Sequence, residues 1–146
     1  PSFLRNNEVS NFSIKSFFFI SRDELDLSQQ FSINNFFQNQ NFAAIVNCAA
    51  YTSVDKAEED KDLAEKINHI AVGQLAKIAK SQSIPLIHIS TDYVFDGLSF
   101  KPYKETDVTN PQNNYGLTKL KGEKAIIASG CSGAIIRHKL VIFRVW

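Results

Sequence analysis

Three side chains between residues 88 and 119 have the types and spacing that a carbonyl reduction requires. Thr91 follows a short apolar strand, and Tyr115 comes twenty-four residues later, four residues before Lys119. Positions i and i+4 of a helix share one face, so Tyr115 and Lys119 should emerge side by side. A neighbouring ammonium should lower the phenol pKa from about 10 toward the neutral range. The pattern predicts a proton-donating site, with the Thr91 hydroxyl beside the phenol to bind a substrate carbonyl.

Structural roles compete with these chemical ones. Tyr-x-x-x-Lys alone is common in helices, and Ser-Thr-Asp at residues 90–92 is also typical of a turn or a helix cap. In the chemical reading, Asp92 holds a substrate hydroxyl. His88 lies on the strand itself, where we expect a packed core residue rather than a base. Acidic residues cluster at a helix start within residues 55–62, where they complement the helix dipole rather than bind a metal.

Strand-like and helix-like segments alternate along the chain, which is typical of a parallel sheet with crossover helices. We expect strands at residues 17–20, 43–49, 85–89 and 133–136, and helices at residues 28–38, 58–81 and 113–129. This order predicts an α/β fold with a doubly wound, Rossmann-like parallel sheet. Polar clusters follow three strands, at residues 23–26, 47–55 and 90–92. Ligands of such sheets bind beyond the carboxyl ends of the strands, so these clusters mark the expected site.

Two helices carry more specific expectations. The long helix has apolar residues at three- and four-residue steps, which should form its buried stripe: Leu63, Ile67, Ile70 and Ile78. The helix of residues 113–129 has three apolar residues that should point away from Tyr115 into the core: Leu117, Leu120 and Ile127. Gly130 is its expected C-terminal stop.

The composition indicates one globular domain. A chain of 146 residues can bury one core, and 44% hydrophobic and 21% charged residues are ordinary values for a soluble protein. The net charge is +1 and the basic residues are scattered, which argues against nucleic acid as a partner. The apolar run at residues 17–20 is too short to span a membrane. Cys48 and Cys131 have no metal-ligand spacing and should be buried, reduced thiols, which favours the cytoplasm.

Four sequence blocks, in their order and spacing, resemble the dTDP-4-dehydrorhamnose reductases of the extended short-chain dehydrogenase/reductase superfamily. The blocks are Asn-Cys-Ala-Ala-Tyr-Thr at 47–52, Val-Asp-Lys-Ala-Glu at 54–58, Ser-Thr-Asp-Tyr-Val-Phe-Asp-Gly at 90–97 and Tyr-Gly-x-Thr-Lys-x-x-Gly-Glu at 115–123. The similarity covers about residues 22–137, within a family-like core of residues 17–137. It is more specific than Tyr-x-x-x-Lys alone.

The resemblance implies reduction of dTDP-4-dehydro-6-deoxy-L-mannose to dTDP-L-rhamnose by hydride transfer from NADPH or NADH. Tyr115 would donate a proton to the C4 oxygen, and Lys119 would bind the nicotinamide ribose and tune the phenol. Thr91 would complete the catalytic group, and Thr91 and Asp92 would contact the sugar. Further cofactor contacts would come from Asp26 and Leu27 at the adenine and from Ala50, Tyr51 and Thr52 after their strand.

The resemblance also implies a dTDP-sugar as partner and a homodimer for a full-length protein. Some family members use Mg²⁺ at a subunit interface, but no ligand set for it is identified in this sequence. No membrane and no nucleic acid are implied.

Both ends of the chain depart from the family pattern. The family opens with a Gly-x-x-Gly-x-x-Gly turn whose N–H groups hold the pyrophosphate, whereas residues 1–16 contain no glycine. After Arg137 the family continues Thr-Ser-Trp-Val-Tyr, whereas this chain has His-Lys-Leu at 138–140. As an alternative, residues 142–146 could be a shifted form of that strand and its Trp.

We therefore expect residues 1–146 to form a partial NAD(P)-binding Rossmann-like domain, incomplete at both ends and without the C-terminal substrate domain. A coding-frame disruption or gene-fragment boundary near Ser16 and Arg137 would explain the pattern. Without the glycine turn, the chain should bind NADPH weakly or not at all and could be inactive.

Two other functions are compatible with the sequence. One is another NAD-dependent sugar-nucleotide enzyme, such as a 4-epimerase or 4,6-dehydratase. Dehydratases usually place acidic residues directly after the catalytic Thr, whereas here Asp92 is followed by Tyr93, which favours the reductase. The other is a non-catalytic binding subunit of the same fold, like the regulatory subunit of methionine adenosyltransferase. The joint presence of Thr91, Tyr115 and Lys119 argues against it.

Overall fold

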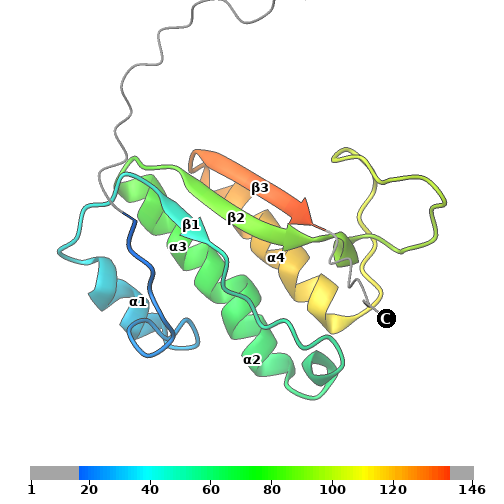
Figure 1. Ribbon diagram of the computed structural model, residues 1–146, viewed down its shortest axis with the longest axis horizontal. Coiled ribbons are helices and arrows are strands. Elements are labelled where there is room, and N and C mark those ends of the chain that lie inside the picture. Colours follow the sequence, from blue (N-terminus) through cyan, green and yellow to red (C-terminus); the bar gives the residue numbers. More distant parts are fainter. Residues whose placement is uncertain (1–16, 139–146) are drawn as a thin grey trace, which may run out of the picture.

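Three parallel strands form the centre of the protein. The computed structural model describes residues 17–138, and its sheet comprises β1 (Ile45–Asn47), β2 (Leu86–Thr91) and β3 (Gly133–His138) in that order. Each crossover connection adds the next strand on the same side of the preceding one, so the sheet grows in one direction. Right-handed crossovers of that kind place their helices on the same side of a sheet, and Figure 1 shows the connecting helices on one face. The predicted Rossmann-like parallel α/β sheet is confirmed.

Seven helical segments accompany the sheet within residues 17–138. They are α1 (Gln30–Phe37), the 3₁₀ turn η1 (Lys56–Glu58), α2 (Lys61–Glu65), the π-helical turn η2 (Lys66–Ile70), α3 (Ala71–Ser81), the 3₁₀ turn η3 (Asp92–Val94) and α4 (Asn114–Ser129). Gly130 ends α4 with φ 64°, in the left-handed region that favours glycine, so the expected stop is confirmed.

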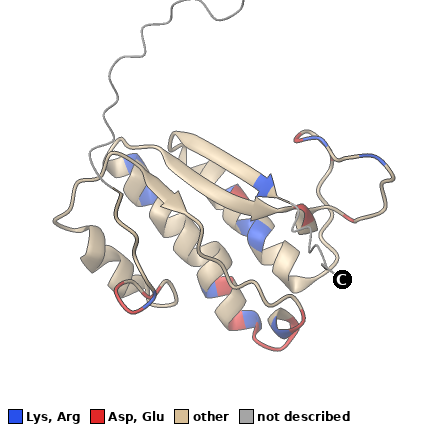
Figure 2. Ribbon diagram, in the orientation of Figure 1, with Lys and Arg blue, Asp and Glu red and all other residues tan. Residues whose placement is uncertain are grey.

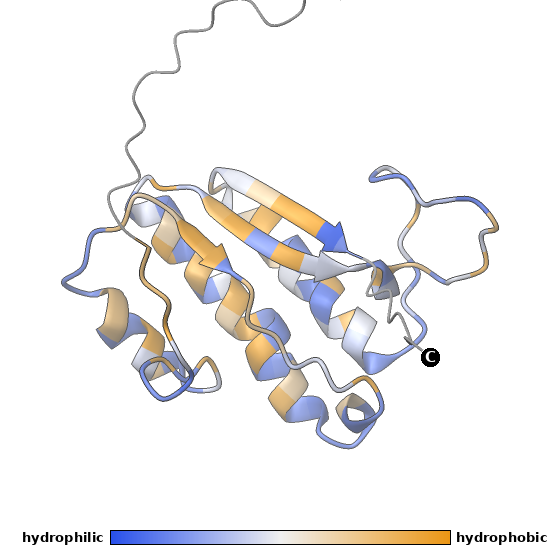
Figure 3. Cartoon of the chain, in the orientation of Figure 1, coloured by the Kyte–Doolittle hydropathy of each residue, from blue (hydrophilic) through white to orange (hydrophobic). Residues whose placement is uncertain are grey.

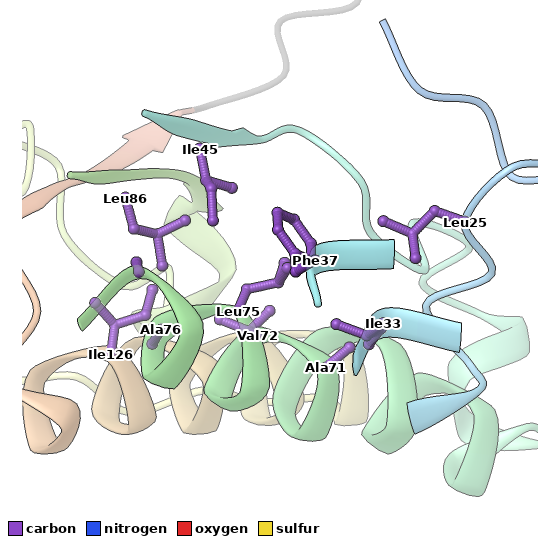
Figure 4. Close-up of a cluster of buried hydrophobic side chains, with 11 residues drawn as sticks. Leu25, Ile33, Phe37, Ile45, Ala71, Val72, Leu75, Ala76, Leu86 and Ile126 are labelled. Atoms are coloured by element: carbon purple, nitrogen blue, oxygen red, sulfur yellow. The ribbon is translucent and has the colours of Figure 1, made fainter. Parts of the chain in front are cut away.

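The main core lies between the sheet and the helices. Figure 4 shows side chains of α1, α3, β1 and β2 meeting there, with Ile126 reaching in from α4. Six side chains of this core are fully buried: Ile33, Ala71, Val72, Ala76, Ala79 and Leu86. Figure 3 shows mostly apolar strands and helices in which apolar and polar residues alternate. Burial of this apolar surface is the main force that fixes the helices on the sheet.

The predicted strand at residues 17–20 is wrong. This segment makes no strand pairing, and Phe17, Phe18 and Phe19 are 69%, 72% and 91% exposed. Phe18 packs only edge-on against Phe42, with ring centroids 6.3 Å apart. An apolar run becomes a strand only where a neighbouring strand accepts its hydrogen bonds, and none of the described strands does so.

The predicted buried stripe of the long helix is also displaced. Leu63, Ile67 and Ile78 are half-buried and Ile70 is exposed. The fully buried positions are instead Ala64, Asn68, Ala71, Val72, Ala76 and Ala79. The displacement already exists at Leu63 and Ala64, before η2 begins, and the buried positions keep helical spacing through η2. Tertiary packing therefore sets this face, by turning the neighbouring stripe of small residues inward.

Two smaller expectations need correction, one about the apolar residues of α4 and one about the cysteines. On α4, Leu120 is buried as predicted, but Leu117 and Ile127 are 42% and 71% exposed. Cys48 is exposed and Cys131 half-buried, so neither is the buried thiol that the sequence predicted, although both are free. Small and polar residues take the inward positions of α4 because the helix approaches its neighbours closely.

Charged residues of both signs are spread over the described surface. Figure 2 colours the ribbon by charge and shows Asp and Glu positions gathered around the turn before α2, with basic positions interspersed along the helices. None of the helices within residues 17–138 is long and apolar enough to cross a membrane.

Candidate active site

Thr91 ends β2 at the carboxyl edge of the sheet, as the sequence predicts. Its hydroxyl accepts a hydrogen bond from the Tyr93 N–H (3.2 Å) and so caps η3. It also lies 3.4 Å from Asp92 Oδ1. Thr91 is buried, whereas Asp92 is half-buried and Tyr93 is 44% exposed. The cap and the candidate chemical role therefore coexist, since the hydroxyl is held in place by the turn that follows it.

The start of α4, which carries Tyr115, is anchored at several points. The Asn113 side chain caps the helix by accepting from the Gly116 N–H (2.8 Å). Asn114 donates from its backbone N–H to Glu58 (2.6 Å) and from its side chain to the Ala57 carbonyl (2.7 Å). Two of these bonds reach fifty-six and fifty-seven residues back, to η1. They hold the first turn of α4 at the carboxyl ends of β1 and β2.

Tyr115 lies beside η3, with its ring 5.5 Å from that of Tyr93 in an edge-to-face arrangement. Burial raises the pKa of the Tyr115 phenol above its usual value, and Tyr93 and Asp92 add to this effect. A hydrogen-bonding contact with Thr91 acts in the opposite direction. The structure thus brings Thr91 and Tyr115 together as predicted. The expected lowering of the phenol pKa by Lys119 is wrong for this arrangement, because Lys119 points elsewhere.

Lys119 is turned inward, toward the sheet. It is 1% exposed, and its Nζ donates to the Ile89 carbonyl oxygen (2.7 Å) and lies 3.3 Å from His88 Nε2. Burial lowers the pKa of Lys119 to about 8, and the nearby Glu123 carboxylate opposes this shift. Although Tyr115 and Lys119 lie one helical turn apart, the lysine amine contacts β2 rather than the phenol.

His88 is the packed core residue that the sequence predicts, with no exposed surface. Its Nδ1 lies 3.1 Å from Asn47 Nδ2, on the neighbouring strand β1. Burial, together with the Lys119 charge, lowers the pKa of His88 to about 3. The imidazole is therefore neutral at physiological pH. His88 was not expected to belong to the site, and Asn47 was expected there only as the first residue of the polar cluster at residues 47–55. Only the fold brings both residues to Lys119.

Asn68 is a further site residue that the sequence analysis missed. Its side chain accepts from the Tyr51 N–H (2.9 Å) and donates to the Tyr51 carbonyl (3.1 Å), which fixes the loop after β1. That loop contains Ala50, Tyr51 and Thr52. In the sequence, an Asn among the apolar residues of a predicted helix is a signal that could have found it. The structure shows this Asn fully buried and hydrogen-bonded, as buried polar groups are. The π-helical turn that carries Asn68 is a feature often seen at functional sites.

Asp26 and Leu27 lie in the segment before α1, on the β1 side of the sheet (Figure 1). The Asp26 carboxylate accepts from the Ser28 N–H (2.9 Å), which lowers its pKa. Leu27 packs against the main core. Neither residue is hydrogen-bonded to Thr91 or Tyr115. The predicted cofactor residues therefore form two separate groups, one at β1 and one at β2.

The loop after η3 is held by aromatic and ionic contacts. The rings of Phe95 and Tyr103 stack 4.3 Å apart, and the Arg137 guanidinium lies 5.1 Å from the Phe95 centroid. Arg137 also forms an ion pair with the buried Glu123 (2.7 Å). Ser90 donates to the same carboxylate (2.5 Å). These bonds join β3 and α4 to the end of β2 that carries Thr91.

Metal-ligand chemistry is not evident in the part of the chain that the structure describes. Residues 17–138 contain no group of three or more His, Cys, Asp or Glu side chains that could hold a metal ion. The His138 that follows Arg137 ends β3, whereas residues 139–146 and the proposed shifted motif at 142–146 lie outside the described residues.

Comparison with known proteins identifies the family. A family model described as the RmlD substrate binding domain matches residues 7–143. The chain belongs to this family. The match extends beyond the core of residues 17–137 that the motifs indicate.

Three similar proteins illustrate the relationship. The dTDP-4-dehydrorhamnose reductase of Burkholderia thailandensis is 44% identical over 111 residues, which are 76% of this chain and 37% of that protein. The methionine adenosyltransferase 2 subunit beta of Bos taurus is 47% identical over 93 residues, 64% of this chain and 28% of that protein. The crystal structure of the Bacillus anthracis dTDP-4-dehydrorhamnose reductase in complex with NADP superposes with a TM-score of 0.78 at 33% identity, covering 82% of this chain and 43% of that one.

The chain spans less than half the length of these relatives. The part matched by the family model, residues 7–143, includes the sheet, α4 and the Thr91–Tyr115 pair.

Proposed function

We propose that this chain supplies the proton-transfer face of a reductase that converts dTDP-4-dehydro-6-deoxy-L-mannose to dTDP-L-rhamnose. The observation that carries the proposal is the Tyr115 phenol beside Thr91 at the carboxyl end of β2, in a chain of this family. The names of the relatives support the substrate class, since the Burkholderia and Bacillus proteins are dTDP-4-dehydrorhamnose reductases.

In this proposal Tyr115 is the proton donor. Its raised pKa keeps the phenol protonated at neutral pH, as a donor to a developing alkoxide must be. The sugar C4 oxygen would accept that proton while bound by the Thr91 hydroxyl, and Asp92 would bind a sugar hydroxyl. The C4 carbonyl becomes a C–H and O–H pair, so the reaction also consumes one hydride.

NADPH is the proposed source of that hydride. The β2 end of the site offers a nicotinamide one of the two expected groups, the Tyr115 phenol, whereas Lys119, one turn later on α4, is buried against β2. To hold the ribose, the Lys119 amine would have to leave the Ile89 carbonyl oxygen and His88. Ala50, Tyr51 and Thr52 would lie along the cofactor, with Asp26 and Leu27 at the adenine. The pyrophosphate is less well served, because residues 17–138 offer no glycine-rich turn at a helix N-terminus. We therefore propose weak NADPH binding by this chain.

A product assay at millimolar NADPH tests the proposal. The protein is incubated with dTDP-4-dehydro-6-deoxy-L-mannose, and sugar nucleotides are separated by chromatography. We expect slow formation of dTDP-L-rhamnose that falls about 100-fold or more in Tyr115→Phe, since a general acid contributes about 10²–10⁴-fold. Tyr103→Phe is the matched control, because Tyr103 packs on Phe95 away from Tyr115.

Each other outcome of this assay has a meaning. An epimer or a dehydrated sugar would assign the chain to another sugar-nucleotide enzyme class. Equal turnover by the Tyr115→Phe variant, or no turnover at saturating NADPH and sugar, would contradict the proposal.

A non-catalytic binding role is the second candidate. It is favoured by the 47% identity to the subunit beta of Bos taurus methionine adenosyltransferase 2. It also fits the inward position of Lys119, which leaves the amine engaged with β2 rather than with the phenol. Mg²⁺ and a homodimer belong only to the proposal for a longer protein.

A further inference from the structure

A continuous chain of hydrogen bonds runs from the β1–α2 loop to Lys119 through the interior of the sheet. It passes from the Ala49 N–H to Asn47, from Asn47 to His88, and from His88 to the lysine amine. Asn47, His88 and Lys119 are 5%, 0% and 1% exposed. Water therefore competes little for these bonds, and the direction of each one matters.

The direction of the first two bonds follows from donor and acceptor chemistry. The Ala49 N–H can only donate, so the Asn47 atom 3.1 Å away is the carbonyl oxygen Oδ1. The amide nitrogen Nδ2 of Asn47 then faces His88 Nδ1 at 3.1 Å and donates to it. A neutral imidazole that accepts at Nδ1 carries its proton on Nε2.

The last bond then constrains Lys119. The protonated Nε2 of His88 points at Lys119 Nζ, 3.3 Å away. An ammonium has only donors and cannot accept this bond, whereas a neutral amine has one lone pair and two N–H groups. The lone pair would accept from His88, and one N–H would donate to the Ile89 carbonyl oxygen at 2.7 Å.

We propose that Asn47 and His88 are positioning residues that act through Lys119, because their hydrogen-bond direction favours its neutral amine form. The direction of these bonds acts in the same sense as burial, so the neutral amine of Lys119 is favoured by hydrogen-bond geometry as well as by the exclusion of water. The effect of this protonation state on catalysis rests on the proposed function, in which Lys119 belongs to a reductase site. The protonation state itself does not rest on the proposed function.

Other charged groups near Lys119 also affect whether its amine is protonated. Glu123, one turn later on α4, favours the ammonium, and Arg137 of β3 neutralises part of that carboxylate through their ion pair. His88 is the titratable group that faces the amine from β2, and β1 contributes only the neutral Asn47. Burial lowers the pKa of Lys119 to about 8, in the same direction as the proposed effect of His88.

Nuclear magnetic resonance of the wild-type protein tests the inference without cofactor or substrate. Long-range ¹H–¹⁵N spectra of the imidazole should show the Nε2–H form of His88. With ¹³C-labelled lysine, the signal that disappears in Lys119→Arg should titrate at least about one pH unit below an ordinary lysine at about 10.4. An Nδ1–H form of His88 would overturn the proposal.

Asn47→Asp provides the reversing variant. A carboxylate at this position accepts from Nδ1–H, which moves the imidazole proton and presents an Nε2 lone pair to Lys119. The Lys119 titration should rise by about one pH unit or more. Asn35→Asp, on the exposed side of α1, adds the same charge away from the chain and should leave the titration unchanged.

An unchanged Lys119 titration in folded Asn47→Asp would also contradict the inference. If that variant fails to fold, the wild-type tautomer decides alone. Loss of reductase activity would not affect either readout, so failure of the proposed function is distinguishable.

Discussion

Asn68 joins the loop after β1 to the helix that carries the catalytic candidates, because its Nδ2 donates to the Thr118 hydroxyl 3.2 Å away. The same amide also bonds both backbone groups of Tyr51. Thr118 immediately precedes Lys119, so one buried side chain sets the spacing between two parts of the site, at Tyr51 and at Thr118, that are sixty-seven residues apart in sequence.

Replacing Asn68 by Ala should therefore destabilise the protein and loosen this loop. The Tyr51 N–H and carbonyl and the Thr118 hydroxyl lose their partner, so we expect a loss of about 2–4 kcal/mol in the free energy of unfolding. Urea unfolding followed by circular dichroism measures it. Asn35→Ala, an exposed change on α1, is the control and should stay within about 0.5 kcal/mol. Equal effects of the two substitutions would contradict the anchoring role.

The contact between α4 and η3 makes Gly116 intolerant of a side chain. A Cβ atom there would lie 2.1 Å from the Tyr93 carbonyl oxygen, so the first turn of α4 would have to move away. Gly116→Ala should cost about 2 kcal/mol or more and should shift the Tyr115 ring resonances. In the control Gly73→Ala the new Cβ lies 3.3 Å from Ala125 Cβ, and the gain in helix propensity of about 1 kcal/mol offsets the tight contact. A Gly116→Ala variant as stable as the wild type would refute this close approach.

The Glu123–Arg137 ion pair offers a double-variant test. The Glu123 side chain is 2% exposed, so Arg137→Met would leave a buried carboxylate without its cation. We expect a loss of about 3–5 kcal/mol in the free energy of unfolding. Glu123→Leu combined with Arg137→Met should recover most of it, because an apolar pair has no charge to desolvate. Denaturant titration of both variants checks this, and a double variant worse than the single one would count against it.

His88 should make the stability of the protein depend on pH in the acid range. Its pKa is about 3 in the folded protein, compared with an ordinary value of 6.5, so the unfolded chain binds more protons between these values. Stability is therefore lost as pH falls from about 6.5 toward 3, by roughly 5 kcal/mol from this residue. His88→Gln should flatten this part of the stability–pH curve. Thermal unfolding at several pH values measures the slopes, and parallel curves for wild type and His88→Gln would disprove the assignment.

The sequence predicted those parts of the structure that depend on local patterns. The apolar runs at β1, β2 and β3 and the Gly130 stop were correct, because each is encoded within a few residues. The run at residues 17–20 failed because a strand also needs a partner, which no local pattern specifies. The long helix was placed correctly, but its buried face was not, because tertiary packing turned the neighbouring stripe of small residues inward instead of the larger apolar side chains.

The candidate site shows the same limit. Tyr115 and Thr91 were recognised from motif spacing, and the structure places them together. The direction of Lys119 could not be predicted, because it depends on His88, thirty-one residues earlier, and through it on Asn47 of another strand. Helical spacing fixes where a side chain leaves the backbone, whereas tertiary neighbours decide where a long side chain ends.

The strand order β1–β2–β3 repeats the order of synthesis. As the chain leaves the ribosome, β2 meets a β1 that already exists, and β3 later meets a completed β2. Among the three described strands, none has to be inserted between two earlier ones, so translation can extend this part of the sheet one edge strand at a time. Each crossover helix also emerges between the two strands that it connects. The hydrophobic surface of one strand is therefore covered once the next helix and strand have emerged. This order shortens the period in which a nascent chain could aggregate.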